Sequence, residues 1–358
     1  MAVLDEEVNV PSGTRSTTDR DDRRPAPVAA TTLASRRKSL EGPVEAQGHN
    51  PCSWSAPTLT ATQRRRRDSP TLSAVMPEGH TIHRYARDHT KLLGGRTIRV
   101  SSPQGRFEAD AARVDGATLA SVMGYGKHLF YEWSTGEVGH VHLGLFGKFR
   151  LQHSEASPGP IGQVRMRMQV EPDSVGDDYV TVDLSGPTAC SIDPPSVRRD
   201  ILARLGPDPI RRGSKPDAMF AKIERSSRGI GDLLMDQSVV AGVGNVYRAE
   251  ALFVTGIHPL RPGNELDRAE LDALWATIQG MLRQGVKDGR IVTVSREELG
   301  IAANARIPRR EATYAYKRES CLRCGDEIRR IEIANRTCYY CPTDQPETRA
   351  GTRRSLGS

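Results

Sequence analysis

The feature that most constrains the fold is a series of short segments with the hydrophobic pattern of β-strands, which begins shortly after residue 76. The segments are residues 97–100, 119–122, 127–133, 138–145, 164–170 and 180–184. Residues 164–170 alternate strictly and place two valines and two methionines on one face. A helix pattern over residues 81–93, closed by two glycines, precedes the series. Short strands at near-regular spacing favour a β-sandwich or barrel behind a leading helix.

The pattern becomes helical after Pro194 and Pro195. Helices are expected over residues 197–205, 218–225, 230–236, 245–255 and 268–284, and residues 289–316 are irregular and basic. Four cysteines follow between Cys321 and Cys341, with the spacing of a metal site rather than a disulfide framework. We therefore expect an α+β multidomain chain. Its parts are an N-terminal β-sandwich at residues 76–195, a helical domain at 196–300 and a C-terminal zinc-finger hairpin at 301–345, with disordered segments at 1–75 and 346–358.

The net charge of +7, from 51 Lys and Arg against 44 Asp and Glu, lies mainly in the part expected to fold. Residues 1–75 hold 11 basic and 9 acidic residues, which leaves +5 for the rest of the chain. This excess weakly favours a polyanionic partner. No apolar run approaches the roughly 18 residues of a membrane helix, and the acidic start does not resemble a secretory signal. The composition predicts a soluble, intracellular protein without a membrane partner.

Residues 1–75 are rich in Ser, Thr, Pro, Ala and Arg and contain one aromatic residue, Trp54. Such a segment buries too little apolar surface to offset the entropy of ordering it. The run Arg64 to Arg67 is either a nucleic-acid-binding tail or a solvated charge run, and the second is the commoner case. Alternatively, the segment is not made in the cell and translation starts at Met76.

Residues 76–80, Met-Pro-Glu-Gly-His, could take part in catalysis if Met76 is an initiator methionine and is removed. Pro77 would then carry a free α-amine, and such amines titrate near ~8, well below lysine at ~10.4. A partly neutral amine can attack a sugar aldehyde carbon, as Schiff-base lysines do. Glu78 could move the protons that the reaction needs. Taken alone, the pentapeptide also fits a turn followed by the start of a helix.

A second informative stretch is residues 233–253, where an apolar helix ends and another begins after Gly242 and Gly244. Asn245 occupies the position where the N-cap residue of the second helix is expected. Backbone N–H groups exposed at such a helix start, without side chains crowding the glycines, form a phosphate site. The alternative is an ordinary helix hairpin.

Together with residues 76–80, this stretch resembles the helix-two-turn-helix of the formamidopyrimidine-DNA glycosylase/endonuclease VIII family. The resemblance runs from Met76 to about Gln345, and the opening is most similar to actinobacterial endonuclease VIII-type members. Residues 126–129 (Gly-Lys-His-Leu) resemble the family's hairpin with a phosphate-binding lysine. Residues 142–147 resemble the strand end that carries its duplex-probing residues. Residues 205–209 and 256–259 also match.

The resemblance implies a bifunctional DNA glycosylase/AP lyase of base excision repair, which flips a damaged nucleotide out of the stack. Pro77 would be the nucleophile at C1′, forming an iminium that leads to β,δ-elimination, and Glu78 the proton donor and acceptor. Lys127, which belongs to the catalytic set, and Asn245 would hold phosphates beside the lesion. Leu145 would be the wedge that fills the vacated stack, or else a core strand residue. The implied enzyme is a bacterial, cytoplasmic, nucleoid-associated monomer acting on double-stranded DNA with oxidised bases or abasic sites.

The substrate implied within the family is an oxidised pyrimidine or an abasic site. Residues 189–195 lack the Arg and Phe that the formamidopyrimidine branch uses to pair with the orphan base. Residues 144–146 (Gly-Leu-Phe) lie where the endonuclease VIII branch has Gln-Leu-Tyr. The alternative function is a non-catalytic damaged-DNA-binding protein on the same scaffold, if Pro77 is not the mature N-terminus.

The cysteine spacing, Cys321-x2-Cys324, thirteen residues and Cys338-x2-Cys341, fits one structural Zn2+ held by four thiolates. The family usually has sixteen residues between the pairs, and that register makes Cys341 the third ligand and Asp344 the fourth. It also puts Arg336 five residues before Cys341, where the family keeps a phosphate-binding arginine. The sequence leaves the fourth ligand open between Cys338 and Asp344, since thiolate is the commoner ligand and carboxylate oxygen is permitted.

Overall fold

The computed structural model describes residues 77–174 and 177–347. The N-terminal segment at 1–75 with its arginine run, Met76, and the C-terminal tail beyond residue 347 lie outside the described residues, so the predictions made for them stay predictions.

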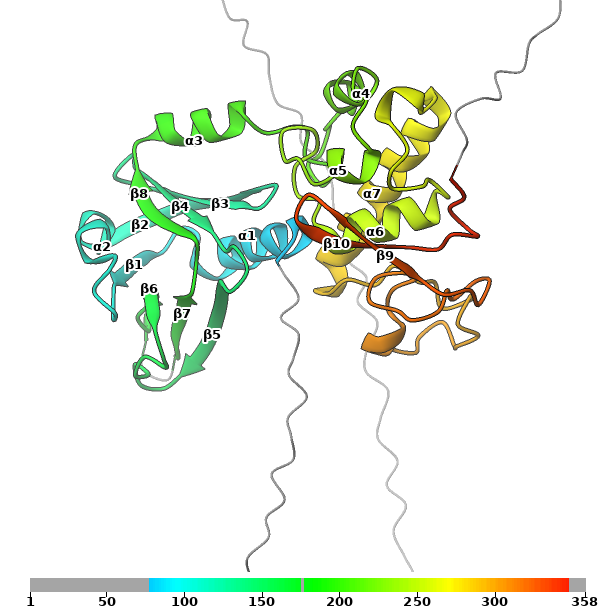
Figure 1. Ribbon diagram of the computed structural model, residues 1–358. Coiled ribbons are helices and arrows are strands. Elements are labelled where there is room, and N and C mark those ends of the chain that lie inside the picture. The colour runs from blue at the N-terminus through cyan, green and yellow to red at the C-terminus, as the bar shows by residue number, and fades with distance from the viewer. Residues whose placement is uncertain (1–76, 175–176, 348–358) are drawn as a thin grey trace, which may run out of the picture. The chain divides into compact units, whose positions relative to one another are not determined.

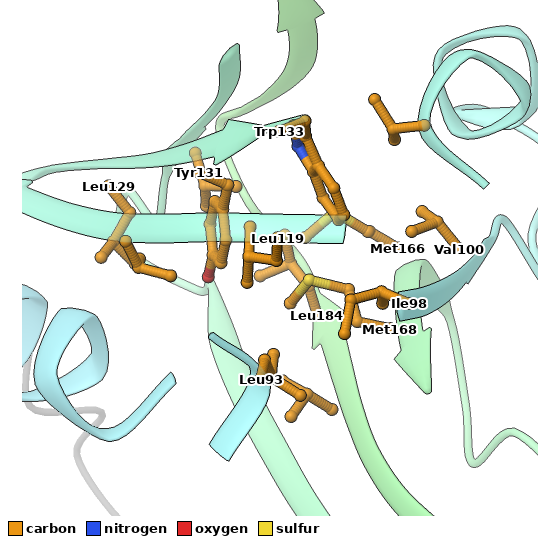
Figure 2. Packing of buried hydrophobic residues seen from close by; sticks show 14 of the residues in the cluster. Leu93, Ile98, Val100, Leu119, Leu129, Tyr131, Trp133, Met166, Met168 and Leu184 are labelled. Atoms are coloured by element: carbon orange, nitrogen blue, oxygen red, sulfur yellow. The ribbon is translucent and has the colours of Figure 1, made fainter. Parts of the chain in front are cut away.

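The N-terminal strands form one antiparallel ladder in the order β5-β7-β6-β1-β2-β3-β4-β8. Strands β1 and β2 pair at only two positions, and the halves on either side of this junction share one buried core. Figure 2 shows Leu119 and Trp133 of one half with Met168 and Leu184 of the other. The β-sandwich prediction is confirmed. The strands are β1 Thr97–Ser101, β2 Ala117–Tyr125, β3 His128–Trp133, β4 Val138–His142, β5 Lys148–Ser154, β6 Val164–Val170, β7 Tyr179–Ser185 and β8 Ala189–Asp193.

The alternation predicted for residues 164–170 holds, because both valines and both methionines of β6 are buried. Arg167, on the other face of this strand, is buried as well. It pairs with Asp183 of β7 through two hydrogen bonds of 2.7 Å, a bidentate geometry that satisfies both charges. The sequence did not predict β5, β8 or the short helix α2 (Glu108–Val114).

Helix α1 (Gly79–Leu93) joins the sandwich to the helical part of the chain. Its apolar residues Ile82, Ala86 and Leu93 enter the sandwich core, as the spacing over residues 81–93 predicts. Along its length the helix contacts β2 and also α7, and Figure 1 shows it running from the strands towards α6. The first turn of α1 therefore lies where the two parts of the chain meet.

The helical part contains α3 (Pro195–Ala203), α4 (Asp217–Ile223), α5 (Ile230–Leu233), α6 (Asn245–Val254) and α7 (Arg268–Asp288). Helix α6 is buried on nearly all sides, and its charged residues Arg248 and Glu250 are buried with its apolar ones. Helix α7 begins with a capping box of Asp267 and Glu270 and ends at Gly289 in the left-handed conformation. The predicted helices are present, although α5 ends earlier than residue 236.

The C-terminal part contains the hairpin β9 (Arg329–Ile333) and β10 (Arg336–Tyr340). Ala334 and Asn335 connect the strands with φ of 54° and 55°, as a type I′ turn requires. Strand β10 packs on α6, and both lie side by side in Figure 1. The predicted α+β architecture is thus present in full. None of the helices among the described residues is long and apolar enough to cross a membrane.

Candidate active site

A pocket of about 370 Å³ lies where the sandwich, the helical part and the β9–β10 hairpin meet. Its walls come from six separate segments of the chain. The residues that the sequence analysis assigned to chemistry or DNA contact all line it: Pro77, Glu78, Lys127, Leu145, Asn245 and Arg336. The structure therefore brings together every one of these residues, with 259 positions of sequence between the first and the last.

Glu78 connects the starts of two helices. It is the N-cap residue of α1, yet its side chain makes no bond there. Its carboxylate instead accepts hydrogen bonds from the backbone N–H groups of Gly244 (2.9 Å), Val246 (2.9 Å) and Tyr247 (3.4 Å), at the start of α6. The N-cap of α6 is Gly244, which has no side chain to satisfy these groups. Glu78 thus caps a helix whose N-cap residue lies 166 positions later in the chain.

The environment shifts the pKa of both Glu78 and Lys127. Burial raises the pKa of Glu78 above its usual value, against the opposing effects of the Lys127 charge and the three N–H donors. Burial also lowers the pKa of Lys127 to about 8, with a contribution from Arg336 and with Glu78 acting in the opposite direction. The pocket therefore holds an acid that keeps its proton more readily than usual and a lysine that gives up its proton more readily.

At the helix start that was expected to bind phosphate, the backbone N–H groups of Gly244 and Val246 donate to Glu78 instead. Asn245 is also not the N-cap. It is the first residue of α6, and its amide donates to the Thr337 carbonyl at 3.0 Å while its oxygen accepts from Arg248. The Asn245 side chain still lines the pocket, so its predicted phosphate contact stays a prediction.

Glycines let the backbones at this junction approach closely. The N–H of Gly79 donates to the Gly242 carbonyl at 2.8 Å, and a Cβ at Gly79 would lie 2.9 Å from the Gly242 Cα. A Cβ at Gly244 would lie 2.4 Å from the Glu78 carboxyl carbon. Side chains at these positions would push Glu78 out of its place.

Asp208 positions the hairpin that carries Lys127. Its carboxylate accepts from the N–H of Gly126 at 2.7 Å and lies 2.6 Å from the His83 Nε2 of α1, and it is almost fully buried. The Gly-Pro-Asp-Pro sequence at residues 206–209 resembles the family, but it indicates no role for Asp208. The signal available was an acidic residue between two prolines, which says nothing of its partners 82 and 125 residues away.

Leu145 lies in the turn after β4, not in a strand, because β4 ends at His142. Its side chain is 44% exposed and that of the neighbouring Phe146 is 77% exposed, so Leu145 is not a core residue. Gly144 has φ of +65°, and a Cβ there would lie 1.8 Å from the Thr188 hydroxyl. The turn thus presents Leu145 to the pocket, with the exposed Phe146 next to it in the chain. His142, which the sequence analysis did not single out, also lines it.

The β9–β10 hairpin is tied to α6 by Arg248, whose side chain is completely buried. The guanidinium donates to the Asn245 oxygen and to the carbonyls of Ile333 (3.3 Å) and Thr337 (3.4 Å). These bonds hold the hairpin against the start of α6. Arg336, the first residue of β10, thereby reaches the pocket.

A second cluster of side chains lies at the end of the hairpin. The ligand atoms of Cys321, Cys324, Cys341 and Asp344 all lie within 4.8 Å of one another and could hold a metal ion. Cys338 is not part of this group. It lies within β10, buried and close to the Arg248 charge, whereas Cys341 follows the end of the strand. The structure thus groups Asp344, and not Cys338, with the three other cysteines.

The sequence is similar to two domain families and to whole proteins of one family. Residues 76–184 match the sequence model of the formamidopyrimidine-DNA glycosylase N-terminal domain, and residues 205–296 match that of its H2TH domain. Endonuclease 8 1 of Mycobacterium tuberculosis (strain H37Rv) is 45% identical over 276 residues, which cover 75% of this chain and 100% of the relative. Formamidopyrimidine-DNA glycosylase of Geobacter metallireducens is 30% identical over 276 residues, with the same coverage.

The fold is similar to that of Lactococcus lactis Fpg (MutM), solved in complex with a DNA that contains N7-benzyl-Fapy-dG. The TM-score is 0.61 at 23% identity, and the match covers 76% of this chain and 100% of the other. Identity of 45% along the whole length of a relative goes well beyond a shared fold. The chain belongs to the formamidopyrimidine-DNA glycosylase/endonuclease VIII family of DNA repair glycosylases.

Proposed function

We propose that this protein is a bifunctional DNA glycosylase/AP lyase whose nucleophile is the α-amine of Pro77. The nitrogen bonds to C1′ of the damaged nucleotide, and the base leaves with the electrons of the glycosidic bond. The C1′–O4′ bond of the sugar then breaks, Glu78 supplies the proton that O4′ takes up, and the open-chain iminium results. Loss of a proton at C2′ from the resulting iminium then expels the 3′ phosphate, and a second elimination expels the 5′ phosphate. The observation that carries this proposal is that Pro77 and the buried Glu78 share one pocket with Lys127.

The proposal requires that Pro77 becomes an N-terminus. Two findings support this: the N-terminal domain model begins at residue 76, and relatives match over their whole length within three quarters of this chain. If residue 77 keeps its peptide bond, the same pocket can bind DNA but its nitrogen cannot form the iminium. That alternative is the non-catalytic binding protein.

In the proposed complex, Lys127, Asn245 and Arg336 contact phosphates beside the lesion. Leu145 enters the stack in place of the flipped nucleotide, since it is exposed at the mouth of the pocket. We further propose that the protein acts as a monomer, in the cytoplasm, on nucleoid DNA.

An oxidised pyrimidine is the proposed substrate. Strands β7 and β8 are joined by Gly186, Pro187 and Thr188 alone. None of these residues has the guanidinium group or the aromatic ring that could contact an orphan base. This loop lies near the turn that carries Leu145, since the Thr188 side chain lies close to Gly144. The higher identity to the relative named endonuclease 8 supports the same choice.

The function is tested with the form that starts at Pro77 and with duplexes containing thymine glycol, 8-oxoguanine or an abasic site. We expect strand cleavage with phosphate at both new ends, and covalent trapping by borohydride, because the reagent reduces the C=N bond. Cleavage should be faster for thymine glycol than for 8-oxoguanine. Cleavage without any trapped species would exclude the iminium, and a preference for 8-oxoguanine would reverse the substrate assignment.

We propose one structural Zn2+ at Cys321, Cys324, Cys341 and Asp344, since three sulfurs and one carboxylate oxygen suit this ion. The ion would fix the end of the hairpin. Asp344→Ala is therefore expected to lower bound zinc well below one per chain, measured by atomic emission after dialysis. The matched variant Cys338→Ser removes a thiol outside the group and should keep one zinc. Loss of zinc from Cys338→Ser alone would contradict the assignment.

The shifted pKa of Lys127 predicts that DNA binding takes up a proton. The free lysine loses its charge near pH 8, whereas a bound phosphate favours the charged form. Affinity should therefore fall between pH 7.5 and pH 9.5 by up to roughly tenfold per pH unit. Lys127→Arg, which stays charged throughout, should be flat over the same range. Fluorescence anisotropy at constant salt measures this, and parallel profiles for the two proteins would contradict the contact.

A further inference from the structure

The segment of residues 314–318 is held by a carboxylate that the proposed chemistry does not use. Glu250 of α6 is completely buried, and it accepts hydrogen bonds from the backbone N–H groups of Tyr314 (2.6 Å), Ala315 (2.9 Å) and Tyr316 (2.8 Å). The hydroxyl of Thr293 donates to the same carboxylate at 2.5 Å. The backbone of this segment is thus fixed to the helix that starts at the active site.

The segment then turns in a conformation that suits glycine. The N–H of Arg318 donates to the Ala315 carbonyl at 3.2 Å, which closes a β-turn with Lys317 at its third position. Lys317 has φ of +57°, whereas Tyr316 before it has negative φ, and this is the pattern of a type II turn. Glycine or asparagine occupies that position without strain, but a lysine does so at a cost in backbone energy.

Among the described residues, only three that are not glycine have positive φ. Ala334 and Asn335 are two of them, and the two-residue hairpin turn explains both. The type II turn likewise accounts for the positive φ of Lys317, but this turn favours glycine or asparagine at that position and the chain has a lysine there. Strained residues persist where the surrounding structure enforces them, and they concentrate at functional sites. The presence of a lysine at this strained position therefore indicates a function for its side chain.

The lysine lies beside the active-site pocket. Tyr316 lies near the side chain of Asn245, which lines the pocket, and burial together with the nearby Glu78 charge raises the pKa of this tyrosine. The Lys317 ammonium lies 5.6 Å from the centre of the Tyr316 ring, and Tyr316 packs edge-on against Tyr339 of β10.

A second cation, Arg330 of β9, has its guanidinium 5.9 Å from the centre of the Tyr339 ring. Lys317 and Arg330 are both exposed. Exposed cations alternating with aromatic rings are typical of surfaces that follow a nucleic-acid backbone.

We propose that Lys317 contacts a backbone phosphate of bound DNA next to the pocket, and that the strained turn exists to place its ammonium there. The contact rests on the proposed function, since it concerns DNA at the same site. It adds a cation from the segment between α7 and the hairpin to the cations on the β2–β3 hairpin and on β10. The buried Glu250 is the positioning residue for it.

The test compares stability and DNA affinity in the full chain. Lys317→Gly removes both the cation and the strain, so its melting temperature should rise. Its affinity for an undamaged duplex should nevertheless fall about five- to tenfold at low salt. The slope of log affinity against log salt should decrease by about one, as expected when one phosphate contact is lost. Lys317→Arg should keep the slope of the parent protein.

Matched variants separate the outcomes. Asn335→Gly changes another left-handed position without removing a charge, so it should leave the affinity unchanged. Lys127→Ala serves as the reference contact, and undamaged duplex is used so that failure of the chemistry does not affect the readout. If Lys127→Ala lowers the salt slope and Lys317→Gly does not, the Lys317 proposal is overturned while the proposed function stands. If neither changes it, the proposed DNA interface fails as a whole.

Discussion

One extra residue ahead of Pro77 is expected to abolish both covalent trapping and base excision, while DNA binding is retained. The added peptide bond turns the amine into an amide, whose nitrogen electrons are delocalised into the carbonyl and are not nucleophilic. The ring of Pro77 and the rest of the pocket keep their places. For the same reason, the chain as printed should be nearly inactive, and the form starting at Pro77 should cleave.

The measurement is borohydride trapping on an abasic duplex, followed by gel electrophoresis, with binding measured in parallel by anisotropy. Intact mass must show that the extended form has not been trimmed. Robust trapping by the intact extended form would mean that another amine is the nucleophile, and Lys127 would be the first to test. Pro77→Gly is a poor probe, because it retains a free primary amine.

Glu78→Gln is expected to slow removal of an intact damaged base by about 10²–10⁴-fold, the usual contribution of a positioned proton donor. Trapping on an abasic site should survive, because no base has to be expelled there. Glutamine keeps one acceptor oxygen for the start of α6 and places an NH2 group against the other N–H donors, so some loss of stability is also expected.

Gly244→Ala provides an independent test of the same unit, since the new Cβ would lie 2.4 Å from the Glu78 carboxyl carbon. We expect it to slow base removal as well, without changing any titratable group. Gly280→Ala is the control, because a Cβ there meets nothing within 4 Å. Unchanged base removal in both Glu78→Gln and Gly244→Ala would remove Glu78 from the proton-transfer role.

The pH dependence of stability follows from the raised pKa of Glu78. A carboxyl with a raised pKa in the folded state binds its proton more tightly there than in the unfolded chain. Its contribution to stability is therefore complete below pH 4.5, the unfolded value, and is lost as the pH rises through the folded value. Glu78→Gln should abolish this part of the pH dependence, as read from urea unfolding at a series of pH values.

Much of the fold could be predicted because local patterns determine it. The strict alternation of β6, and the apolar spacing and terminal glycines of α1, were sufficient to place both elements. Strand β5 was missed because its residues are mostly exposed or half-buried, so it has no strong apolar alternation. Strand β4 was predicted too long, because Leu143 is apolar and buried although it follows the strand.

The membership of the site could be predicted from motifs, but its hydrogen bonds could not. The glycines and Asn245 were correctly placed at the start of α6, yet the groups expected to bind phosphate are capped by Glu78 from the other end of the chain. The fourth member of the metal cluster depended on which residue follows the end of β10, and spacing alone does not give the end of a strand.

Because α6 holds the Glu78 carboxylate in place, the amine and the positioned carboxylate become available at different times during synthesis. The ribosome makes Pro77 and Glu78 long before Gly244, so in the proposed form that starts at Pro77 an emerging chain displays the amine before the helix start that holds the carboxylate exists. On the proposed mechanism, such a chain has no fixed proton donor. We therefore expect base removal to begin only when the helical part has docked, and a chain still on the ribosome to be inactive on DNA.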